Sequence, residues 1–441
     1  LAAGDLTGGD DKGTGAAFVD VNNDGWLDLY ACNIDGPNQL FINQRDGRFL
    51  EEAGARGVQF QGATTMCSFA DYDRDGDLDL YLVNNRILSL AEEKPVIKLR
   101  RIGGRLTVPP EYAEQVFLIN GRVAEAGQKD RLYRNDGKGN FVDVTDAAGI
   151  AGFDMGLSAT WWDYDGDGWM DIYVANDLKT PDHLYHNQKD GTFRDVISKT
   201  ATHTPWFSMG ADSADINNDG MMDFLVADMS STTHYKQKTT MGEMGNSAWF
   251  LTTGKPRQFM RNMLLVNTGG ERFQEAANLA GLDSTDWTWS VKFGDLDSDG
   301  LVDLFVTNGV GRNLNDSDAE VEYQKLLATG DKEAAQIQFF KPRKERNLAF
   351  QNAGELAFEN KSQAWGIDHL GVSQGASLVD LDRDGDLDLL VNNMNEPLGI
   401  YRNEIAAAQN LIVKLQGTTS NRFGLDAKVT VGLGEVELVR Y

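Results

Sequence analysis

Short apolar runs recur along the chain, and each ends in Asn or Asp. They read LYACN, LYLVN, IYVAN, FLVAD, LFVTN and LLVNN and begin at residues 29, 80, 172, 224, 304 and 389. Runs of this length between turn residues are typical of buried strands. A strand-like stretch precedes each run, as in residues 13–19, and a segment with an Asn follows it, as in residues 132–135. With the Phe after the next Gly turn, the pattern predicts a unit of about four short strands.

An acidic nine-residue pattern, D-x-[DN]-x-D-G-x-x-D, separates the first strand of each unit from the second. Its six copies begin at Asp20, Asp71, Asp163, Asp215, Asp295 and Asp380. The two shortest separations, 51 and 52 residues, indicate a unit of about 50 residues, and the longer separations contain inserts. Small sheets that cannot bury their faces alone must pack side by side. The sequence therefore predicts an all-β fold, a β-propeller of four-stranded blades.

The nonapeptide offers only oxygen ligands. Side chains at positions 1, 3 and 5 converge, the Gly at position 6 permits a sharp turn, and the carbonyl at position 7 and the Asp at position 9 complete the set. Such hard ligands suit Ca²⁺ rather than Zn²⁺ or copper, so we expect about six Ca²⁺ ions. The predicted metal ligands are Asp20, Asn22, Asp24, Trp26 and Asp28; Asp71, Asp73, Asp75, Asp77 and Asp79; Asp163, Asp165, Asp167, Trp169 and Asp171; Asp215, Asn217, Asp219, Met221 and Asp223; Asp295, Asp297, Asp299, Leu301 and Asp303; and Asp380, Asp382, Asp384, Asp386 and Asp388.

These loops are predicted to close β-hairpins. An EF-hand shares the first six positions but needs Glu at position 12 and an exiting helix. Position 12 here is apolar and lies inside a predicted strand: Ala31, Leu82, Val174, Val226, Val306 and Val391. A solvated Asp-rich turn would explain one copy, whereas six copies favour a metal site. Loops one and four carry Asn at position 3, so they offer three carboxylates where the other loops offer four.

Composition narrows the function classes. The chain has 441 residues, a formal net charge of −26 and 41% hydrophobic residues, which excludes wholesale disorder. Such acidity argues against a nucleic-acid partner, and no apolar run reaches the roughly 18 residues of a membrane span. Cys32 and Cys67 are too few for a disulfide scaffold; they either pair between neighbouring units or, as we prefer, remain buried free thiols. Calcium loops of this kind often bind weakly, so we expect them to be fully occupied only in a calcium-rich compartment.

Two segments, DYDRDGDLDLYLVN (71–84) and LYRNDGKGNFVDVTDAAGI (132–150), resemble the FG-GAP/VCBS repeats of integrin-α-like propellers. Nearly the whole chain is similar to the cartilage acidic protein/UnbV (ASPIC/UnbV) family, including residues 285–316 and the tail 410–431. The resemblance implies a propeller over 1–409 and the start of an ASPIC/UnbV-like β module over 410–441. It implies seven blades, which we prefer over six although six loops are visible.

The resemblance also implies a secreted or cell-surface protein with a binding or matrix role, whose partner is an extracellular protein or a glycan. The chain starts at Leu1 without Met or a leader. This beginning indicates either a fragment or a removed signal peptide.

Three stretches lie outside the basic unit: residues 84–131, 229–262 and 309–346. Together they are net basic, unlike the remainder of the chain. Such inserts either cover the propeller and pad its edges, or build a binding surface on one face. In the third insert, Ser317 and Glu320 have capping-box spacing ahead of VEYQKLLA, which predicts a short helix.

Other motifs carry weaker signals. Ser373 fits a G-x-S-x-G pattern but leads into a strand, whereas a nucleophile elbow must open a helix. His183 and His186 lack Cys partners, so surface or packing roles are expected. Trp161, Trp162, Trp287 and Trp289 are expected to pack between blades, with a sugar platform as the alternative.

We therefore predict a secreted calcium-binding propeller that acts as an extracellular binding, adhesion or scaffold protein and is not an enzyme. One alternative is a structural subunit that self-associates into a filament or surface layer. The other is a polysaccharide lyase or hydrolase, because propellers host such enzymes.

Overall fold

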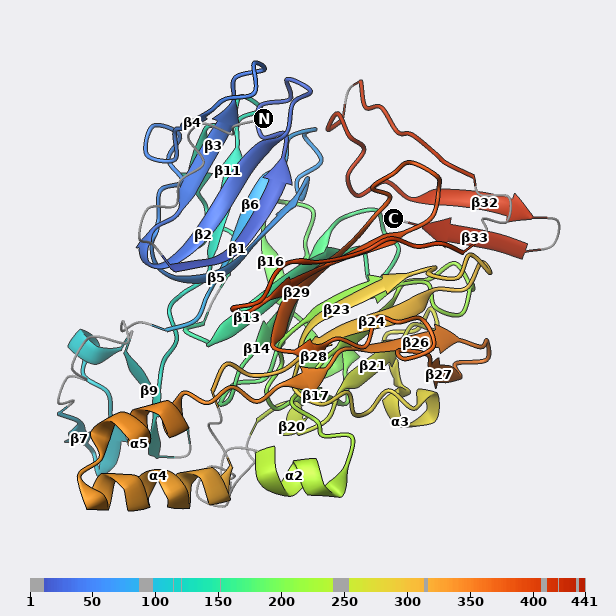
Figure 1. Ribbon diagram of the computed structural model, residues 1–441. Helices are drawn as coiled ribbons and strands as arrows, with labels where there is room; N and C mark the ends of the chain where they lie inside the picture. Colours follow the sequence, from blue (N-terminus) through green and yellow to red (C-terminus); the bar gives the residue numbers. More distant parts are fainter. Residues whose placement is uncertain are drawn as a thin grey trace. The chain divides into compact units, whose positions relative to one another are not determined.

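A computed structural model describes residues 12–86, 98–113, 115–119, 121–150, 152–240, 254–312, 316–405, 411–418, 420–433 and 436–440. The chain is rich in strands, arranged as a series of small antiparallel sheets (Figure 1). It divides into two compact units, one of residues 1–199 with 414–428 and 441, and the other of residues 200–413 with 429–440. The all-β, propeller-like arrangement of small sheets confirms the predicted fold class.

The first unit contains three four-stranded repeats. These are β1 (Lys12–Val19), β2 (Asp28–Pro37), β3 (Gln39–Asn43) and β4 (Phe49–Glu51); β5 (Gln61–Ala70), β6 (Asp79–Asn84), β11 (Arg131–Asn135) and β12 (Phe141–Asp143); and β13 (Gly156–Trp162), β14 (Asp171–Asn176), β15 (His183–Asn187) and β16 (Phe193–Asp195). The first two sheets are joined because β2 also pairs with β5. The insert between β6 and β11 holds two hairpins and a 3₁₀ helix: β7 (Arg100–Ile102) with β8 (Arg105–Thr107), the helix Pro110–Tyr112, and β9 (Val116–Ile119) with β10 (Arg122–Glu125).

The second unit holds three further repeats. They are β18 (Ala211–Ala214), β19 (Asp223–Val226), β21 (Met263–Val266) and β22 (Gln274–Glu275); β23 (Thr288–Gly294), β24 (Asp303–Asn308), β26 (Leu348–Asn352) and β27 (Phe358–Asn360); and β29 (Ser373–Val379), β30 (Asp388–Asn393) and β31 (Gly399–Tyr401). Short pairs accompany them: β17 (His203–Pro205) with β20 (Arg257–Phe259), β25 (Glu345–Arg346) with β28 (Leu370–Gly371), and β32 (Val429–Leu433) with β33 (Val436–Arg440). The described residues thus contain six repeat sheets, each with one acidic loop.

Helices are short and mostly lie in or beside the inserts. They are α1 (Ile197–Thr200), α2 (His234–Thr240), α3 (Ala277–Ala280), α4 (Ser317–Thr329) and α5 (Lys332–Phe339). The helix predicted in the third insert is present as α4, but its N-cap is Asp316, whose side chain accepts from the backbone N–H groups of Asp318 and Ala319. The cap therefore lies one residue before Ser317, because an Asp carboxylate serves the first-turn donors as well as a hydroxyl does.

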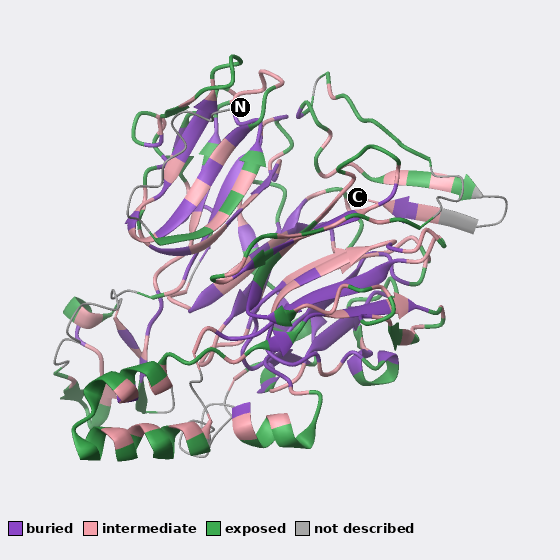
Figure 2. Cartoon of the chain, in the orientation of Figure 1, coloured by how far each residue is buried: buried purple, intermediate pink, exposed green. Residues whose placement is uncertain are grey.

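The second strand of each repeat forms the core. Every residue of β6, β14 and β24 is buried, and Figure 2 shows these strands in purple. A strand that is covered on both faces by neighbouring sheets needs apolar residues without alternation. This is why the six runs read as continuous apolar segments, and it confirms that position 12 of each loop lies in a strand rather than a helix.

None of the helices in the described ranges is long and apolar enough to cross a membrane.

Candidate metal sites in the repeat loops

Each acidic loop closes the hairpin between the first two strands of its repeat. In loop one, the Asp20 carboxylate accepts from the backbone N–H of Asp24 at 3.0 Å and of Gly25 at 2.8 Å. The same contacts recur from Asp163, Asp215 and Asp295, and Asp71 and Asp380 make the contact to the Gly. The side chain at position 1 therefore fixes the turn from within.

Two positions of every loop have positive φ. The Gly at position 6 was expected to do so, and it does in all six loops. The residue at position 4 also adopts the left-handed region, although only one of the six is Gly: Asn23, Arg74, Gly166, Asn218, Ser298 and Arg383. Non-Gly residues pay a steric cost there, so the position-4 conformation must be imposed by the hydrogen bonds around it.

The Asp at position 9 is buried in every loop, with at most 1% of its surface exposed: Asp28, Asp79, Asp171, Asp223, Asp303 and Asp388. It pairs with the last residue of the first strand. One of its oxygens accepts from the backbone N–H of an Asn at the end of the third strand or just after it, which we call the third-strand Asn, as in Asn135 to Asp79 at 2.8 Å. In five loops the other oxygen accepts from the N–H at position 2, as in Leu296 to Asp303 at 2.8 Å.

The same third-strand Asn reaches the loop of the preceding repeat. The Asn135 Nδ2 donates to the carbonyl of Val21 in loop one at 2.8 Å and to that of Leu78 in its own loop at 3.0 Å. Asn187, Asn352 and Asn403 make the equivalent pair of contacts. Each of these amides therefore fastens two consecutive loops together within its unit. We call this contact the Asn clasp.

In loops two, three, five and six, three carboxylates each place an oxygen within 4.8 Å of the others. The sets are Asp71, Asp73 and Asp79; Asp163, Asp165 and Asp171; Asp295, Asp297 and Asp299; and Asp380, Asp382 and Asp388. These clusters could hold a metal ion. They come from positions 1, 3, 5 and 9, the side-chain positions that the sequence predicted.

Several carboxylate oxygens in these clusters are buried without a hydrogen-bond partner, namely Oδ1 of Asp71, Asp73, Asp297 and Asp380 and Oδ2 of Asp79. Burial and the neighbouring carboxylates raise the pKa of Asp79 to about 9. Burial also raises the pKa of Asp71 to about 6 and those of Asp223 and Asp303 to about 7. Buried, unpaired carboxylates that repel one another are costly unless a cation is present. The donor set therefore fits Ca²⁺.

Loops one and four fold in the same way despite Asn at position 3. The Asn22 Oδ1 accepts from the N–H of Asp24 at 3.1 Å, and the Asn217 Oδ1 accepts from Asp219 at 3.1 Å. The amide oxygen thus replaces the carboxylate oxygen in the turn. These two loops carry one negative charge fewer than the other four.

Comparison with known families supports this repeat assignment. An FG-GAP-like repeat matches residues 20–82, 116–174, 163–226 and 250–306, which together exceed half of the chain. The chain belongs to the FG-GAP-like repeat family. Each match begins or ends within an acidic loop or the strand that follows it.

Individual relatives of this FG-GAP-like chain are distant. Cartilage acidic protein 1 of Mus musculus is 21% identical over 472 aligned residues, covering 95% of this chain and 63% of that protein. The Xenopus tropicalis protein of the same name is 26% identical over 188 residues, covering 37% of this chain and 29% of that protein. These matches confirm the resemblance to the cartilage acidic protein family, although the chain spans less than two-thirds of these relatives' length.

Among solved structures, a lectin of Agrocybe aegerita, described for its specific recognition of non-reducing terminal N-acetylglucosamine, is 14% identical with a TM-score of 0.42. The match covers 90% of this chain and 81% of the lectin.

Sequence reasoning missed polar residues that approach position 3 of the FG-GAP-like loops. The His186 Nδ1 lies 3.2 Å from Asp171 Oδ1 and 3.7 Å from Asp165 Oδ2, so its imidazole faces loop three. Its hydrogen bond to Asp171 raises the pKa of His186. Gln351 and Arg402 contact Asp297 and Asp382 in the same manner.

A signal for these contacts exists in the sequence. All three residues immediately precede the third-strand Asn, and Arg134 has this place for loop two. The loops with Asn at position 3 have Ile42 and Val266 there instead. A polar residue before the Asn therefore accompanies Asp at position 3.

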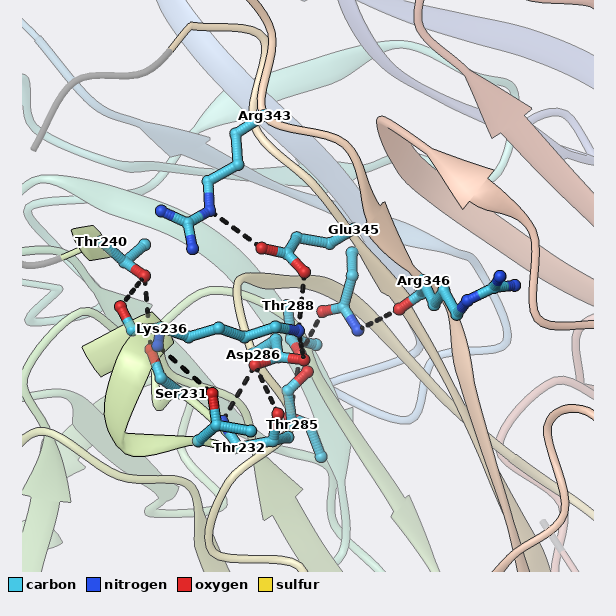
Figure 3. Close-up of polar contacts among 12 residues, drawn as sticks. Ser231, Thr232, Lys236, Thr240, Thr285, Asp286, Thr288, Arg343, Glu345 and Arg346 are labelled. Atoms are coloured by element: carbon cyan, nitrogen blue, oxygen red, sulfur yellow. Dashed lines mark hydrogen bonds and ion pairs between the residues drawn. The ribbon is translucent and has the colours of Figure 1, made fainter. Parts of the chain in front are cut away.

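A second candidate site lies between two inserts of the second unit (Figure 3). The Lys236 ammonium on α2 donates to Asp286 Oδ2 at 2.6 Å and to Glu345 Oε2 at 2.7 Å. Thr232 donates its N–H and its hydroxyl to Asp286 Oδ1, and the Arg343 Nε lies 2.8 Å from Glu345 Oε1. Burial lowers the pKa of Lys236, but its hydrogen bonds to the two carboxylates raise it overall.

This ionic cluster borders a pocket of about 430 Å³ whose other walls include Ser284, Leu348, Phe350 and Leu370. We call it the insert pocket. A neighbouring cavity of about 330 Å³ shares Leu348 with it and extends toward Asp368. The cluster joins insert residues to the loop before β23, and sequence order alone could not show this convergence.

The weaker motifs have structural explanations. Ser373 is fully buried at the start of β29, where its hydroxyl donates to Asn393 Oδ1 at 2.7 Å and accepts from Asn347 Nδ2 at 2.9 Å. It therefore lies in a strand, as predicted. Trp161 is buried and stacks on Tyr72 with ring centroids 6.2 Å apart, which supports packing between neighbouring sheets. Cys32 and Cys67 are both buried and free in the structure.

His183 lies between two carboxylates rather than facing a metal loop. Its Nε2 is 2.9 Å from Asp154 Oδ2 and its Nδ1 is 2.8 Å from Asp195 Oδ2. Burial by itself lowers the pKa of His183, but its acidic neighbours raise it well above its ordinary value. The residue therefore acts as a charged bridge within the first unit, in line with the expected packing role.

Proposed function

We propose that this FG-GAP-like chain is a calcium-stabilised protein that works outside the cell as a binding, adhesion or scaffold protein. The observation that carries the proposal is the repeated cluster of carboxylates within 4.8 Å of one another, several with buried unpartnered oxygens. The proposed ligands are the side chains at positions 1, 3, 5 and 9 and the carbonyl at position 7 of each loop. About six Ca²⁺ ions would pin the six hairpins.

Calcium at these loops would be structural. Two carboxylates about 4 Å apart repel by up to about 4 kcal/mol at an effective dielectric near 20, and a divalent cation turns that repulsion into attraction. Calcium loops of extracellular modules often bind at about 10⁻⁴ to 10⁻³ M. Full occupancy therefore favours a secreted or cell-surface location.

The insert pocket is the proposed ligand-binding surface of the second unit. Pockets lined by apolar side chains with a few fixed polar groups are the usual form of a binding site. The charged groups at its border are all ion-paired, Arg346 with Asp368 beyond the pocket, so none is poised for acid–base or nucleophilic chemistry. We therefore propose binding without turnover, with an extracellular protein or a glycan as partner.

Thermal unfolding in calcium and in EGTA tests the proposal. We expect a higher melting temperature in millimolar CaCl₂ than in excess EGTA, a much smaller gain in MgCl₂, and about six Ca²⁺ per chain by elemental analysis. Identical melting curves in calcium and EGTA would refute calcium stabilisation.

The two alternatives are tested separately. Sedimentation in calcium that yields only monomers would remove a self-associating filament or surface-layer subunit. Incubation with a polysaccharide panel that releases new reducing ends or unsaturated sugars would establish a lyase or hydrolase and overturn the non-catalytic proposal.

A further inference from the structure

The first insert contains the hairpin of β7, labelled in Figure 1, and β8. This hairpin concentrates positive charge on an acidic protein. The segment from residue 98 to 105 reads KLRRIGGR, and its four cations, Lys98, Arg100, Arg101 and Arg105, are all exposed. The chain as a whole has a net charge of −26. An isolated cationic segment on such a molecule attracts anions that the remaining surface repels.

Three of these four cations form no ion pair within the described residues, although Arg101 donates to the Gly104 carbonyl at 3.4 Å. Arg100 lies 3.1 Å from Glu111, but Lys98, Arg101 and Arg105 form no ion pair in the described part of the chain. Elsewhere in the described ranges the excess of acids pairs many exposed cations, as for Lys12, Arg45 and Arg402. Unpaired cations that stand next to one another are therefore available to an external anion.

The hairpin geometry orders these charges. Gly103 and Gly104 have φ of 58° and 80°, as a two-residue turn with both central residues in the positive region requires. The register pairs Arg100 with Thr107 and Ile102 with Arg105. Directly paired residues share one face of a hairpin, so Arg100, Ile102 and Arg105 lie on the same face. Arg101 pairs with Leu106 and therefore lies on the opposite face, so the hairpin presents arginines on both of its faces.

We propose that this hairpin binds an acidic polysaccharide, a linear sugar chain that carries sulfate or carboxylate groups. Arg105 and Arg100, on the same face, would pair with the anionic groups, since the planar guanidinium group can donate two parallel hydrogen bonds to a carboxylate or sulfate. Ile102, which is 67% exposed on the same face, would contact the apolar face of a sugar ring. The proposal rests on the proposed function, because it names a partner for a protein that binds ligands outside the cell.

A nucleic acid fits the hairpin less well. Duplex DNA carries one negative charge per about 1.7 Å of axis, so a duplex would extend past this short hairpin onto the acidic surface. Each cation near an anionic membrane contributes only about 1 kcal/mol of binding free energy. Three unpaired cations would therefore bind a membrane weakly.

The test is a binding titration of the 441-residue chain in calcium buffer with a size-defined heparin oligosaccharide, which is rich in sulfate, and with hyaluronan, which carries carboxylates only. The variant Arg100→Gln/Arg101→Gln/Arg105→Gln, which neutralises the arginines on both faces of the hairpin, should weaken binding of the preferred polysaccharide at least tenfold. A control variant removes the same number of charges from the helical insert, at Lys325, Lys332 and Lys341.

Binding to the unmodified chain should also weaken as NaCl rises from 50 to 200 mM. Equal binding by the hairpin variant and the control variant would overturn the proposal. So would tighter binding to a duplex oligonucleotide or to phosphatidylserine vesicles than to either polysaccharide. Absence of polysaccharide binding together with an intact calcium-dependent melting shift would overturn this inference alone and leave the calcium proposal standing.

Discussion

Replacing Asp79 by Asn should change stability in opposite directions with and without calcium. Asp79 is fully buried, its Oδ1 accepts from the N–H of Asn135 at 2.8 Å, and its Oδ2 has no partner. An Asn side chain keeps the Oδ1 acceptor and removes the charge. In the calcium-free protein at pH 7 the substitution removes the cost of keeping this buried carboxyl protonated, whereas in the loaded protein it removes a proposed ligand.

The magnitude follows from the pKa of Asp79. Burial raises it from 3.8 to about 9 in the folded, calcium-free protein, so the folded protein at pH 7 holds a proton that the unfolded chain has released. Each pKa unit corresponds to about 1.4 kcal/mol. The calcium-free fold therefore loses stability as pH rises from about 4 toward 9, by about 4 kcal/mol at pH 7. The Asp79→Asn variant should recover up to this amount in EGTA.

Urea unfolding at pH 7 in EGTA and in millimolar calcium provides the measurement. We expect the variant to be more stable than the unmodified chain in EGTA and less stable in calcium. Glu322→Gln, an exposed acid on α4, is the control and should change neither value by more than about 0.5 kcal/mol. A change of the same sign in both buffers would refute the assignment of Asp79 as a calcium ligand.

Three further outcomes follow from other contacts. Lys236→Met should lower the unfolding free energy by about 2–3 kcal/mol, because it leaves the buried Asp286 without a cation and Glu345 with Arg343 alone; Lys325→Met on an exposed helix is the control, and equal losses would contradict the ionic cluster. Asn352→Leu removes one Asn clasp and should cost about 1–3 kcal/mol in urea unfolding, whereas an unchanged midpoint would show that the clasp carries no stability. His183 has a raised pKa, so its stabilising charge is fully present below pH about 6.5 and is lost as pH rises through the higher folded value; His183→Gln should flatten the fall in melting temperature above neutral pH, and an unaltered profile would count against the charged bridge.

Much of the fold was predictable because its information is local. The apolar run after each loop is buried on both faces in the structure, so a strand such as β24 reads as continuous apolar sequence. The acidic positions of each loop are only two to eight residues apart, so their convergence depends on one turn. The prediction placed Asp71, Asp73 and Asp79 together, and the structure does the same.

What the sequence could not give depends on contacts between distant segments. The approach of His186 to Asp165 needs the register of the third strand, and the left-handed backbone at Arg74 is imposed by its loop rather than favoured by its residue type. The cluster around Lys236 joins Asp286 and Glu345, which are separated by 59 positions in the chain. The periodicity of the sequence cannot predict a contact between residues so far apart in the chain.

The Asn clasp has a consequence for how damage spreads. Asn135 and Asn187 each donate a hydrogen bond to the loop of the preceding repeat. Neighbouring loops within a unit are therefore linked in series, and each loop is stabilised by the repeat that follows it. A destabilising mutation in one loop should therefore lower the stability of the adjacent repeat most and have little effect on more distant repeats. An array of such repeats can tolerate one defective copy, and it can acquire insertions between copies, without unfolding of the remaining repeats.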